Sequence, residues 1–444
     1  MLALLAISVE RVVAQTPVPP ERDVRVFDLL EAVSAARIER DVRTLVGFGT
    51  RHTLSDTLSS TRGIGAARRW IKAEFDAISA ACGGCLEVSY QRAMIAGETR
   101  VPDSTWVVSV VAVLRGTMDP ARHIIMTGDI DSRISDVMNA VDSSPGANDN
   151  ASGMAGVLEA ARVITASGHR FPASVAFAGL SGEEQGLYGG ARMAEIAREE
   201  GWRIEAVLNN DMIGNIEGVD GVTDDTTGRV FSESPPAGTT EEELRRMRFF
   251  GGEVDGPSRQ LARYVDRIAD HYLPDLDVLM IYRLDRFGRG GHHRPFNDAG
   301  FPAVRIMETH ENYTRQHQDV RTEDGIAYGD VIEGVDFDYA AKLTGLNVAV
   351  LASLAWAPAP PDSVTIAGAV EPAARLSWSP VAGAGGYKVY WRETTSPTWD
   401  RWIWLGGATE ATMTGLVVDN YFFGVAAVSP DGDESTVVFP VPVR

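Results

Sequence analysis

The chain has 444 residues, of which 44% are hydrophobic and 23% are charged, and this is ample for a sizeable core. Its length favours two or three domains. The net charge of −20 argues against nucleic acid and against an anionic membrane surface as partners. Beyond the N-terminus, no apolar run approaches the roughly 18 residues of a membrane span, so we do not expect a transmembrane protein.

The first 20 residues, MLALLAISVERVVAQTPVPP, predict a leader segment over 1–20. A short apolar stretch is followed by VVAQ, which offers a signal-peptidase site after Ala14. The signal is weak, because no basic residue precedes the apolar stretch and Glu10 and Arg11 interrupt it. We expect a secreted or periplasmic protein on this basis.

The chain has two cysteines, Cys82 and Cys85, in the segment ACGGC. A CxxC pair is typical of a disulfide, a redox pair or half of a zinc site. A zinc knuckle is disfavoured because there is no second CxxC. A small disulfide loop that closes a helix fits an exported protein, and a reduced pair is the alternative.

Strand and helix patterns alternate along most of the chain. The spacing of Ile71, Phe75 and Ile78 predicts a helix over 60–80. Strand patterns then follow in LEVSYQ, TWVVSVVAVLRG and RHIIMTG. Further on, helices are predicted at 151–167, in YGGARMAEIAREE and after 308, and strands at 173–180, 206–214 and 301–308. This alternation predicts an α/β fold, with a sheet covered by helices on both faces.

Two segments interrupt that pattern. Residues 215–250 are rich in small and polar residues and are predicted to be an irregular insertion, and WAPAPPD at 356–362 indicates a linker. Beyond the linker, short alternating segments separated by turn residues predict a β-sandwich. Trp378 and Tyr421 resemble those of a fibronectin type III module. We therefore expect a domain over 21–356 and a small all-β domain over 363–444, which serves as a spacer or contacts a surface or another protein.

Acidic residues follow the predicted strands at the point where each strand ends. They are Asp129 and Asp131, Asp149, Glu183 and Glu184, and Asp211. In open α/β sheets, ligands bind outside the carboxyl ends of the strands, and carboxylates gathered there repel one another unless cations lie between them. The pattern therefore predicts a metal site.

Each piece also has a simpler interpretation. Asp149 precedes a helix and would serve as its N-cap, and Glu183 and Glu184 would stabilise the dipole of the next helix. Asp211, inside an apolar strand, is harder to explain, because buried carboxylates are almost always paired. In an extended chain, Asp129, Asp131 and Arg133 share one face, and Arg133 would either neutralise Asp131 or remain exposed.

The motifs GANDNASG, SGEEQGLYGG, NNDMIG and HHRPFNDAGFPAVRI, with a later histidine, resemble the M28 zinc peptidases over about residues 40–355. The resemblance implies a phosphorylase/hydrolase-like mixed sheet flanked by helices and a site with two zinc ions. It implies that Asp149 bridges the ions, that Glu184 and Asp211 each bind one, and that Glu183 is the general base. It makes His317 the last histidine ligand, with His310 as the weaker rival.

The resemblance also covers positions where this chain departs from the family. His293 matches a histidine near the site in the family's SDHxxF segment, and His292 is its neighbour. The family carries His-x-Asp where this chain has Asp129-Ile130-Asp131, so either Asp129 replaces the histidine as a ligand or that metal position is lost. We expect ligation, because an oxygen ligand is competent for zinc. Asp131 is then a partner of the ligands rather than a ligand.

With Asp129 as a ligand, the four carboxylate ligands carry four negative charges, which balance the four positive charges of two divalent ions. The ions are expected to be zinc, and the added oxygen ligand would let manganese or cobalt compete. The family often has Asp four residues after the histidine ligand, where this chain has Arg321, and that leaves the geometry around His317 open.

Three functions are consistent with these residues. The first is a metallo-aminopeptidase, since the free N-terminus of a peptide suits an acidic crevice. Glutaminyl cyclases resemble this family but use one zinc ion, and Asp149, Glu184 and His317 would be such a set. The third is an inactive binding or adhesion protein that works through its C-terminal module.

Overall fold

The computed structural model describes residues 17–443, so most of the predicted leader lies outside the described residues. An eight-stranded mixed sheet forms its centre, in the order β1-β2-β4-β3-β5-β8-β6-β7. The inner strands β4, β3, β5 and β8 run parallel to one another. The antiparallel pairs are β1 with β2, β2 with β4, and β6 with β8. The strands are β1 Leu86–Ile95, β2 Thr105–Leu114, β3 Asp119–Asp129, β4 Ala173–Leu180, β5 Arg203–Asn210, β6 Thr227–Ser232, β7 Asp277–Ile281 and β8 Ala303–Glu308.

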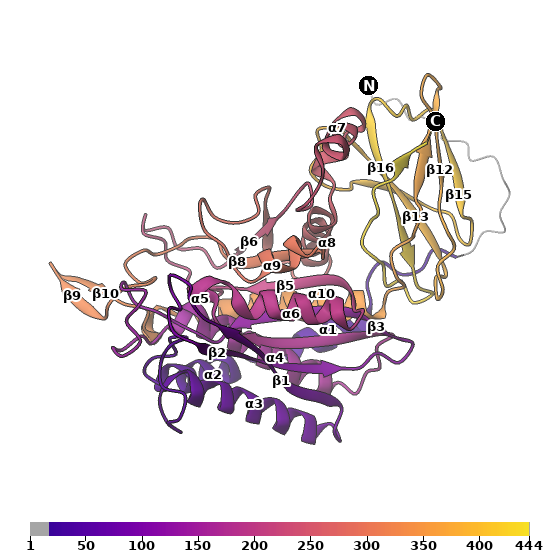
Figure 1. The fold of residues 1–444 in the computed structure, drawn as a ribbon. Coiled ribbons are helices and arrows are strands. Elements are labelled where there is room, and N and C mark those ends of the chain that lie inside the picture. Colours follow the sequence, from indigo (N-terminus) through magenta and orange to yellow (C-terminus); the bar gives the residue numbers. More distant parts are fainter. Residues whose placement is uncertain (1–16, 444) are drawn as a thin grey trace.

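Helices cover both faces of this sheet (Figure 1). Alternate side chains of β3 show why: Ile124 and Met126 join the larger core, while Ile125 joins the smaller core on the other face. The larger core takes residues from α1 Val24–Glu31, α2 Ala35–Gly47, α3 Gly63–Ala81, α4 Gly153–Ala166, α8 Pro257–Tyr272 and α10 Phe337–Trp356. The smaller core takes them from α6 Tyr188–Glu199 and α9 His293–Asp298. The predicted α/β fold with helices on both faces is confirmed.

The segment 215–250 is more regular than the sequence predicts. It contains β6 and the helix α7 Glu241–Phe250, and β6 pairs with both β8 and β7. Thr240 forms a capping box with Glu243 at the start of α7, yet no residue of α7 is buried. The apolar pattern is weak because β6 buries only Val230 and Phe231 as large side chains, and α7 buries none.

The C-terminal part consists of two small β-sheets, with strand orders β15-β12-β11-β17 and β14-β13-β16. Trp378 lies in their common core against Tyr387. An all-β unit is confirmed, and its kinship with fibronectin type III modules stays a prediction. The strands are β11 Thr365–Ala367, β12 Ala373–Ser377, β13 Gly386–Glu393, β14 Arg401–Trp404, β15 Glu410–Thr414, β16 Tyr421–Val428 and β17 Val441–Pro442.

This unit is docked on the α/β part through buried charges. Asp255, just before α8, pairs at 2.7 Å with Arg263 and at 2.8 Å with Arg392 of β13. Trp399 adds a hydrogen bond from its indole N–H to the Gln260 side chain. These contacts attach the β-unit to α8, on the side of the sheet that carries β6 and β7 (Figure 1).

Two further features complete the fold. Cys82 and Cys85 form a disulfide directly after α3, as predicted for a loop that closes that helix. Among residues 17–443, no helix combines the length and apolar character needed to cross a membrane. The remaining short elements are α5 Glu183–Gly186, β9 Arg321–Glu323, β10 Ile326–Tyr328, and the helical turns Ala147–Ser152, Gly252–Val254 and Ile332–Gly334.

Candidate metal centre

The carboxyl ends of three adjacent strands bring the predicted acidic residues together. Asp129 is the last residue of β3, the Glu183–Glu184 pair follows β4, and Asp211 follows β5. Because β4, β3 and β5 are neighbours and parallel, these ends share one edge of the sheet. The predicted strand face shared by Asp129, Asp131 and Arg133 does not form, because β3 ends at Asp129 and the other two residues lie beyond it.

Three of the predicted ligands converge on one point. Nε2 of His317 lies 2.9 Å from Oδ2 of Asp149 and 3.0 Å from Oε1 of Glu184. The three donor atoms all lie within 4.8 Å of one another. An imidazole nitrogen and two carboxylate oxygens form a donor set that suits Zn²⁺ and leaves a position open for water or substrate. The residues present therefore fit one metal ion.

The charges of these groups also fit a cation site. Burial raises the pKa of Asp149, but the nearby His317 outweighs this and leaves that pKa below its ordinary value. The pKa of Glu184 also lies below its ordinary value, because His317 and Arg133 outweigh the effect of its burial. Burial lowers the pKa of His317, whereas the two carboxylates raise it to about 9. In the metal-free protein the hydrogen on Nε2 of His317 is thus shared between the two carboxylates.

Buried groups hold the turn that carries Asp149, and Asp149 is not a simple N-cap. The carboxylate of Asp330 accepts hydrogen bonds from the backbone N–H groups of Asn148 and Asp149, at 2.8 and 2.7 Å. From the other side, the guanidinium of Arg51 donates to the carbonyls of Ile130 and Gly146, at 2.9 and 2.8 Å. Arg51 and Asp330 were missed by the sequence analysis, because their partners are backbone atoms far away in the chain.

Asp131 positions the turn that carries Glu183 and Glu184. Its carboxylate accepts hydrogen bonds from the backbone N–H groups of Gly182, Glu183 and Glu184, at 2.9, 3.2 and 3.1 Å, and from the hydroxyl of Thr53 at 2.8 Å. These contacts occupy both carboxylate oxygens of Asp131. It acts as a buried cap that fixes the helical turn α5.

Arg133 belongs to the metal centre instead of pairing with Asp131. Its Nε lies 2.8 Å from Oε2 of Glu184, and its Nη2 lies 2.6 Å from Nδ1 of His317. The expectation that it would neutralise Asp131 or remain exposed was wrong. Arg133 contacts two of the three candidate ligands and so holds their side chains in place.

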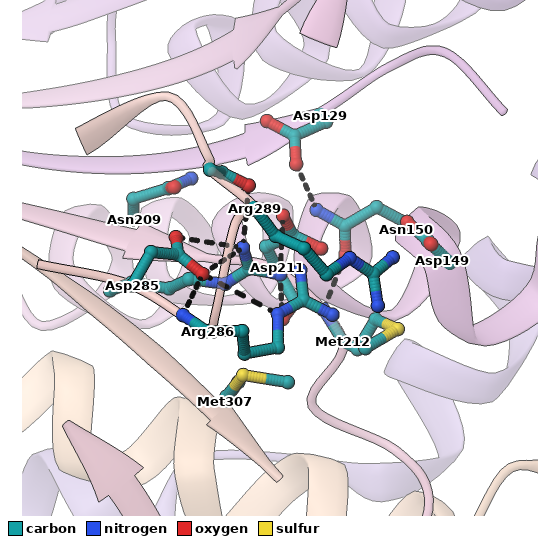
Figure 2. Close-up of polar contacts among 12 residues, drawn as sticks. Asp129, Asp149, Asn150, Asn209, Asp211, Met212, Asp285, Arg286, Arg289 and Met307 are labelled. Atoms are coloured by element: carbon teal, nitrogen blue, oxygen red, sulfur yellow. Dashed lines mark hydrogen bonds and ion pairs between the residues drawn. The ribbon is translucent and has the colours of Figure 1, made fainter. Parts of the chain in front are cut away.

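Asp129 and Asp211 lie outside this cluster, and each has a protein partner of its own. Oδ1 of Asp129 is 2.5 Å from Nδ1 of His292, and its Oδ2 accepts a 2.7 Å hydrogen bond from Asn150. Oδ2 of Asp211 is 2.7 Å from Nη2 of the fully buried Arg305. Figure 2 shows the contact between Asp129 and Asn150, with the Asp285 and Arg286 group lying apart from it.

These partners change the charge of that half of the site. Burial raises the pKa of Asp129 well above its ordinary value and lowers that of His292 to about 4. Both shifts favour neutral forms, so the pair is neutral overall whichever partner holds the shared proton. Burial also raises the pKa of Asp211 to about 8, and the ion pair with Arg305 opposes that rise.

The remaining histidines have other partners. Nε2 of His293 donates to the carbonyl of Leu284 at 2.8 Å, and it lies 3.5 Å from Asp285, which in turn pairs with Arg305. His293 therefore supports the loop next to the site. His310 lies 3.7 Å from Asp224 and takes no part in the three-residue cluster, whereas His317 does.

Glu183 lines an open cleft of about 470 Å³ next to the cluster. Burial and then the nearby Glu184 and Asp211 raise its pKa well above the ordinary value. The cleft is not simply acidic, because five arginines share its lining with four carboxylates. The arginines are Arg100, Arg133, Arg286, Arg289 and Arg294.

This arginine lining corrects the expectation of an acidic crevice. With His317 counted as neutral, five cations against four anions leave a net charge of +1, and each divalent ion would add two. Three of the five lie in the segment DRFGRGGHHRPF, residues 285–296, before and within the first turn of α9. The density of arginine in that segment was a signal in the sequence.

Comparisons with known proteins identify the family of this chain. Residues 109–331, about half of the chain, match Peptidase family M28. A protein of Leptosphaeria maculans named "Probable zinc metalloprotease" is 41% identical over 95% of this chain and 98% of its own length. Among solved structures, the LapA aminopeptidase of Legionella pneumophila has a TM-score of 0.54 at 20% identity, with 78% of each chain covered.

A glutaminyl cyclase of Fimbriiglobus ruber has a TM-score of 0.50 at 15% identity, with 72% of this chain and 95% of its own covered. At such identities the solved structures establish a common fold and nothing finer. The family match and the fungal relative go further, since both extend across the strand ends that carry the metal centre. This chain belongs to peptidase family M28.

Proposed function

We propose that the protein is a metal-dependent aminopeptidase. The observation that carries the proposal is the convergence of Asp149, Glu184 and His317 beside Glu183 in an open cleft. Asp149, Glu184 and His317 would hold one divalent ion, and zinc suits this donor set best. Such an ion, when bound, supplies Lewis acidity toward a carbonyl and lowers the pKa of a water molecule.

The two-ion site that the resemblance implies stays a prediction. A second ion would use Asp149, Asp211 and Asp129. For this, Asp211 must exchange its 2.7 Å partner Arg305 for the ion, and Asp129 must leave His292. Manganese or cobalt would compete with zinc best at such an oxygen-rich position.

Glu183 performs the proton transfers in this proposal. Its carboxylate takes a proton from the attacking water and returns it to the leaving amine. Burial and the neighbouring Glu184 and Asp211 raise the pKa of Glu183, which makes its carboxylate a stronger proton acceptor. Asp131 keeps Glu183 in place by binding the backbone of its turn, and Arg133 keeps Glu184 and His317 in place.

The size of the cleft supports cleavage near a chain end. Its volume of about 470 Å³ lies within the range of small-molecule pockets, about 300–1,000 Å³. A compact cleft of this kind accepts the end of a peptide more readily than the middle of a folded chain. The four carboxylates that line the cleft would attract the α-ammonium group of the substrate.

Replacement of Glu183 by Gln tests the proposal. The substitution keeps the shape of the side chain and removes the proton acceptor, so kcat should fall by about 10²- to 10⁴-fold. The metal content should not change. Glu195→Gln, on the exposed side of α6, is the matched control and should behave like the wild type. Near-normal turnover of Glu183→Gln would reject the assigned role.

A glutaminyl-cyclase-like reaction is the second candidate. The observation that favours it is that only one set of three ligands converges among the described residues, while Asp129 and Asp211 have protein partners. Release of pyroglutamate from a peptide with an N-terminal glutamine would support this reaction. Hydrolysis of that peptide to free glutamine would reject it. If neither product forms in the metal-loaded protein, the remaining alternative is a binding or adhesion protein.

We further propose that the protein is exported, to the periplasm or the medium. The predicted leader and the disulfide between Cys82 and Cys85 support this, since disulfides persist in oxidising compartments. Fractionation of cells that produce the full chain, followed by N-terminal sequencing, tests it. Recovery of uncleaved protein in the cytosol would contradict it.

A further inference from the structure

The arginines of the cleft differ in what they already bind. Arg133 pairs with Glu184, and Arg286 pairs with Glu311 at 2.9 Å. Arg289 donates a 2.9 Å hydrogen bond to Gln316 and lies 3.6 Å from Glu311. These three arginines therefore already have acidic or polar partners within the protein.

Arg100 and Arg294 differ from these three, because they lack an acidic partner. Among residues 17–443, neither has a carboxylate within ion-pair distance. Arg100 Nη1 donates a 2.7 Å hydrogen bond to the backbone carbonyl of Glu184. Nε of Arg294 is buried and has no hydrogen-bond partner. Glu233 acts on Arg294 only through longer-range electrostatics. Both line one cleft, Arg100 as an exposed side chain and Arg294 as a partly buried one, and an anionic ligand there would pair with them.

The position of these two arginines relates the ligand to the metal centre. Arg100 contacts the main chain of Glu184, whose side chain belongs to the metal cluster, so Arg100 lies beside that cluster. Arg294 comes from the first turn of α9, and its guanidinium lies against Gly290, which also lines the cleft. A guanidinium binds a carboxylate through two parallel N–H groups, which fits the end of an aspartate or glutamate side chain.

We propose that the cleft selects peptides whose N-terminal residue is acidic, with Arg100 and Arg294 as the residues that bind its side-chain carboxylate. The proposal rests on the proposed aminopeptidase function and names its substrate class. A carboxylate is favoured over the amide of the same shape, because only the carboxylate forms charge-assisted hydrogen bonds with the two free guanidinium groups.

The test compares substrates that differ only in charge. The zinc-loaded protein is given Glu-Ala, Gln-Ala and Leu-Ala, and kcat/KM is measured for each. We expect Glu-Ala to be preferred over Gln-Ala by about 10- to 100-fold, the size of a charge-assisted hydrogen bond. In Arg100→Gln and Arg294→Gln the ratio should fall toward one. Arg248→Gln, on the exposed helix α7, should keep the wild-type ratio.

A binding measurement separates the two proposals. Calorimetric titration of the zinc-loaded Glu183→Gln variant with free glutamate and free glutamine reports on the carboxylate site without turnover. If peptides are hydrolysed but Gln-Ala is cleaved as well as Glu-Ala, the acidic selectivity is overturned and the aminopeptidase stands. If no peptide is hydrolysed while glutamate binds more tightly than glutamine and Arg294→Gln removes the difference, the carboxylate site stands and the aminopeptidase fails.

Discussion

The two halves of the metal centre treat their carboxylates differently. In the half formed by Asp149, Glu184 and His317, the donor atoms face one another and lie within 4.8 Å. In the half formed by Asp129 and Asp211, the protein supplies the partners itself, an imidazole for one and a guanidinium for the other. Both halves bury acidic groups at the same edge of the sheet, so burial alone does not identify a metal ligand.

The difference indicates where a cation is required. A carboxylate next to a buried Arg or His already has its compensating charge, and a metal ion must displace that partner at a cost in free energy. In the first half, Asp149 and Glu184 share one imidazole, and only Glu184 also pairs with a guanidinium, that of Arg133. The first half therefore gains most from a divalent ion.

Removal of one ligand from each half should give the largest contrast. His317→Ala should weaken zinc binding by more than about 100-fold, which exceeds the effect of losing a supporting group. Asp211→Asn should retain the ion. Elemental analysis after dialysis against a dilute chelator measures both variants. Equal loss of metal would show that Asp211 is also a ligand and would favour the two-ion site.

Removal of the buried cation in the second half should be nearly as severe. Arg305→Met leaves Asp211 without its partner in a buried site and removes one partner of Asp285, so we expect a loss of about 3–5 kcal/mol in the free energy of unfolding. Arg203→Met, which removes an exposed ion pair with Asp119, is the control and should change stability by less than about 1 kcal/mol. Denaturant titration checks both.

The Arg305→Met variant also tests the comparison through the number of metal ions that the protein binds. With Arg305 gone, Asp211 is free to bind a second ion, so excess zinc should stabilise Arg305→Met more than the wild type. A wild-type protein that already binds two ions would contradict this account of Arg305.

The affinity of the first half for zinc should depend strongly on pH. The neighbouring carboxylates raise the pKa of His317 to about 9, against the opposing effect of burial, and a proton on Nε2 competes with the metal. Affinity should therefore rise by about tenfold per pH unit below pH 8 and level off above about 9. Calorimetry across this range measures it, with His310→Ala as the control. An affinity that is constant from pH 6 to 8 would argue against His317 as a ligand.

The metal-free protein should show the corresponding change in stability. The folded pKa of His317 is raised above its unfolded value of about 6.5, so its contribution is fully present below that pH. It is lost as the pH rises through about 9. The Tm of the metal-free protein should fall over this window more than the Tm of the His317→Ala variant.

Exchange of two residues in the second half should give the smallest effect. The family's pattern has His where this chain has Asp129, and the Asp of its SDHxxF segment falls on His292. Their 2.5 Å contact suggests that the two residue types have changed places. Asp129→His and His292→Asp alone each bring two like groups together in a buried site, at a cost of about 1–3 kcal/mol. The double exchange should recover most of that stability in a double-mutant cycle. Additive losses would show that the contact is incidental.

The metal centre was partly predictable. The alternation of strands and helices predicted the sheet, and the resemblance selected Asp149, Glu184 and His317, which the fold brings together. The partners of Asp129, Asp131 and Arg133 were not predictable from GDIDSR alone. Those contacts depend on where β3 ends and on residues 51 to 184 positions away, namely His292, Gly182 and His317.

The sequence by itself determined the fold class and the chemistry at the strand ends, because apolar periodicity and residue type are local properties of a chain. The tertiary structure decided which charges meet. Arg305 lies inside an apolar strand pattern, and only the pairing of β5 with β8 brings it to Asp211. Arg100 and Arg294 are almost 200 residues apart, and only the folded cleft makes them neighbours of one site. Electrostatic interactions depend on distance in space, and long-range distances are set by the tertiary fold.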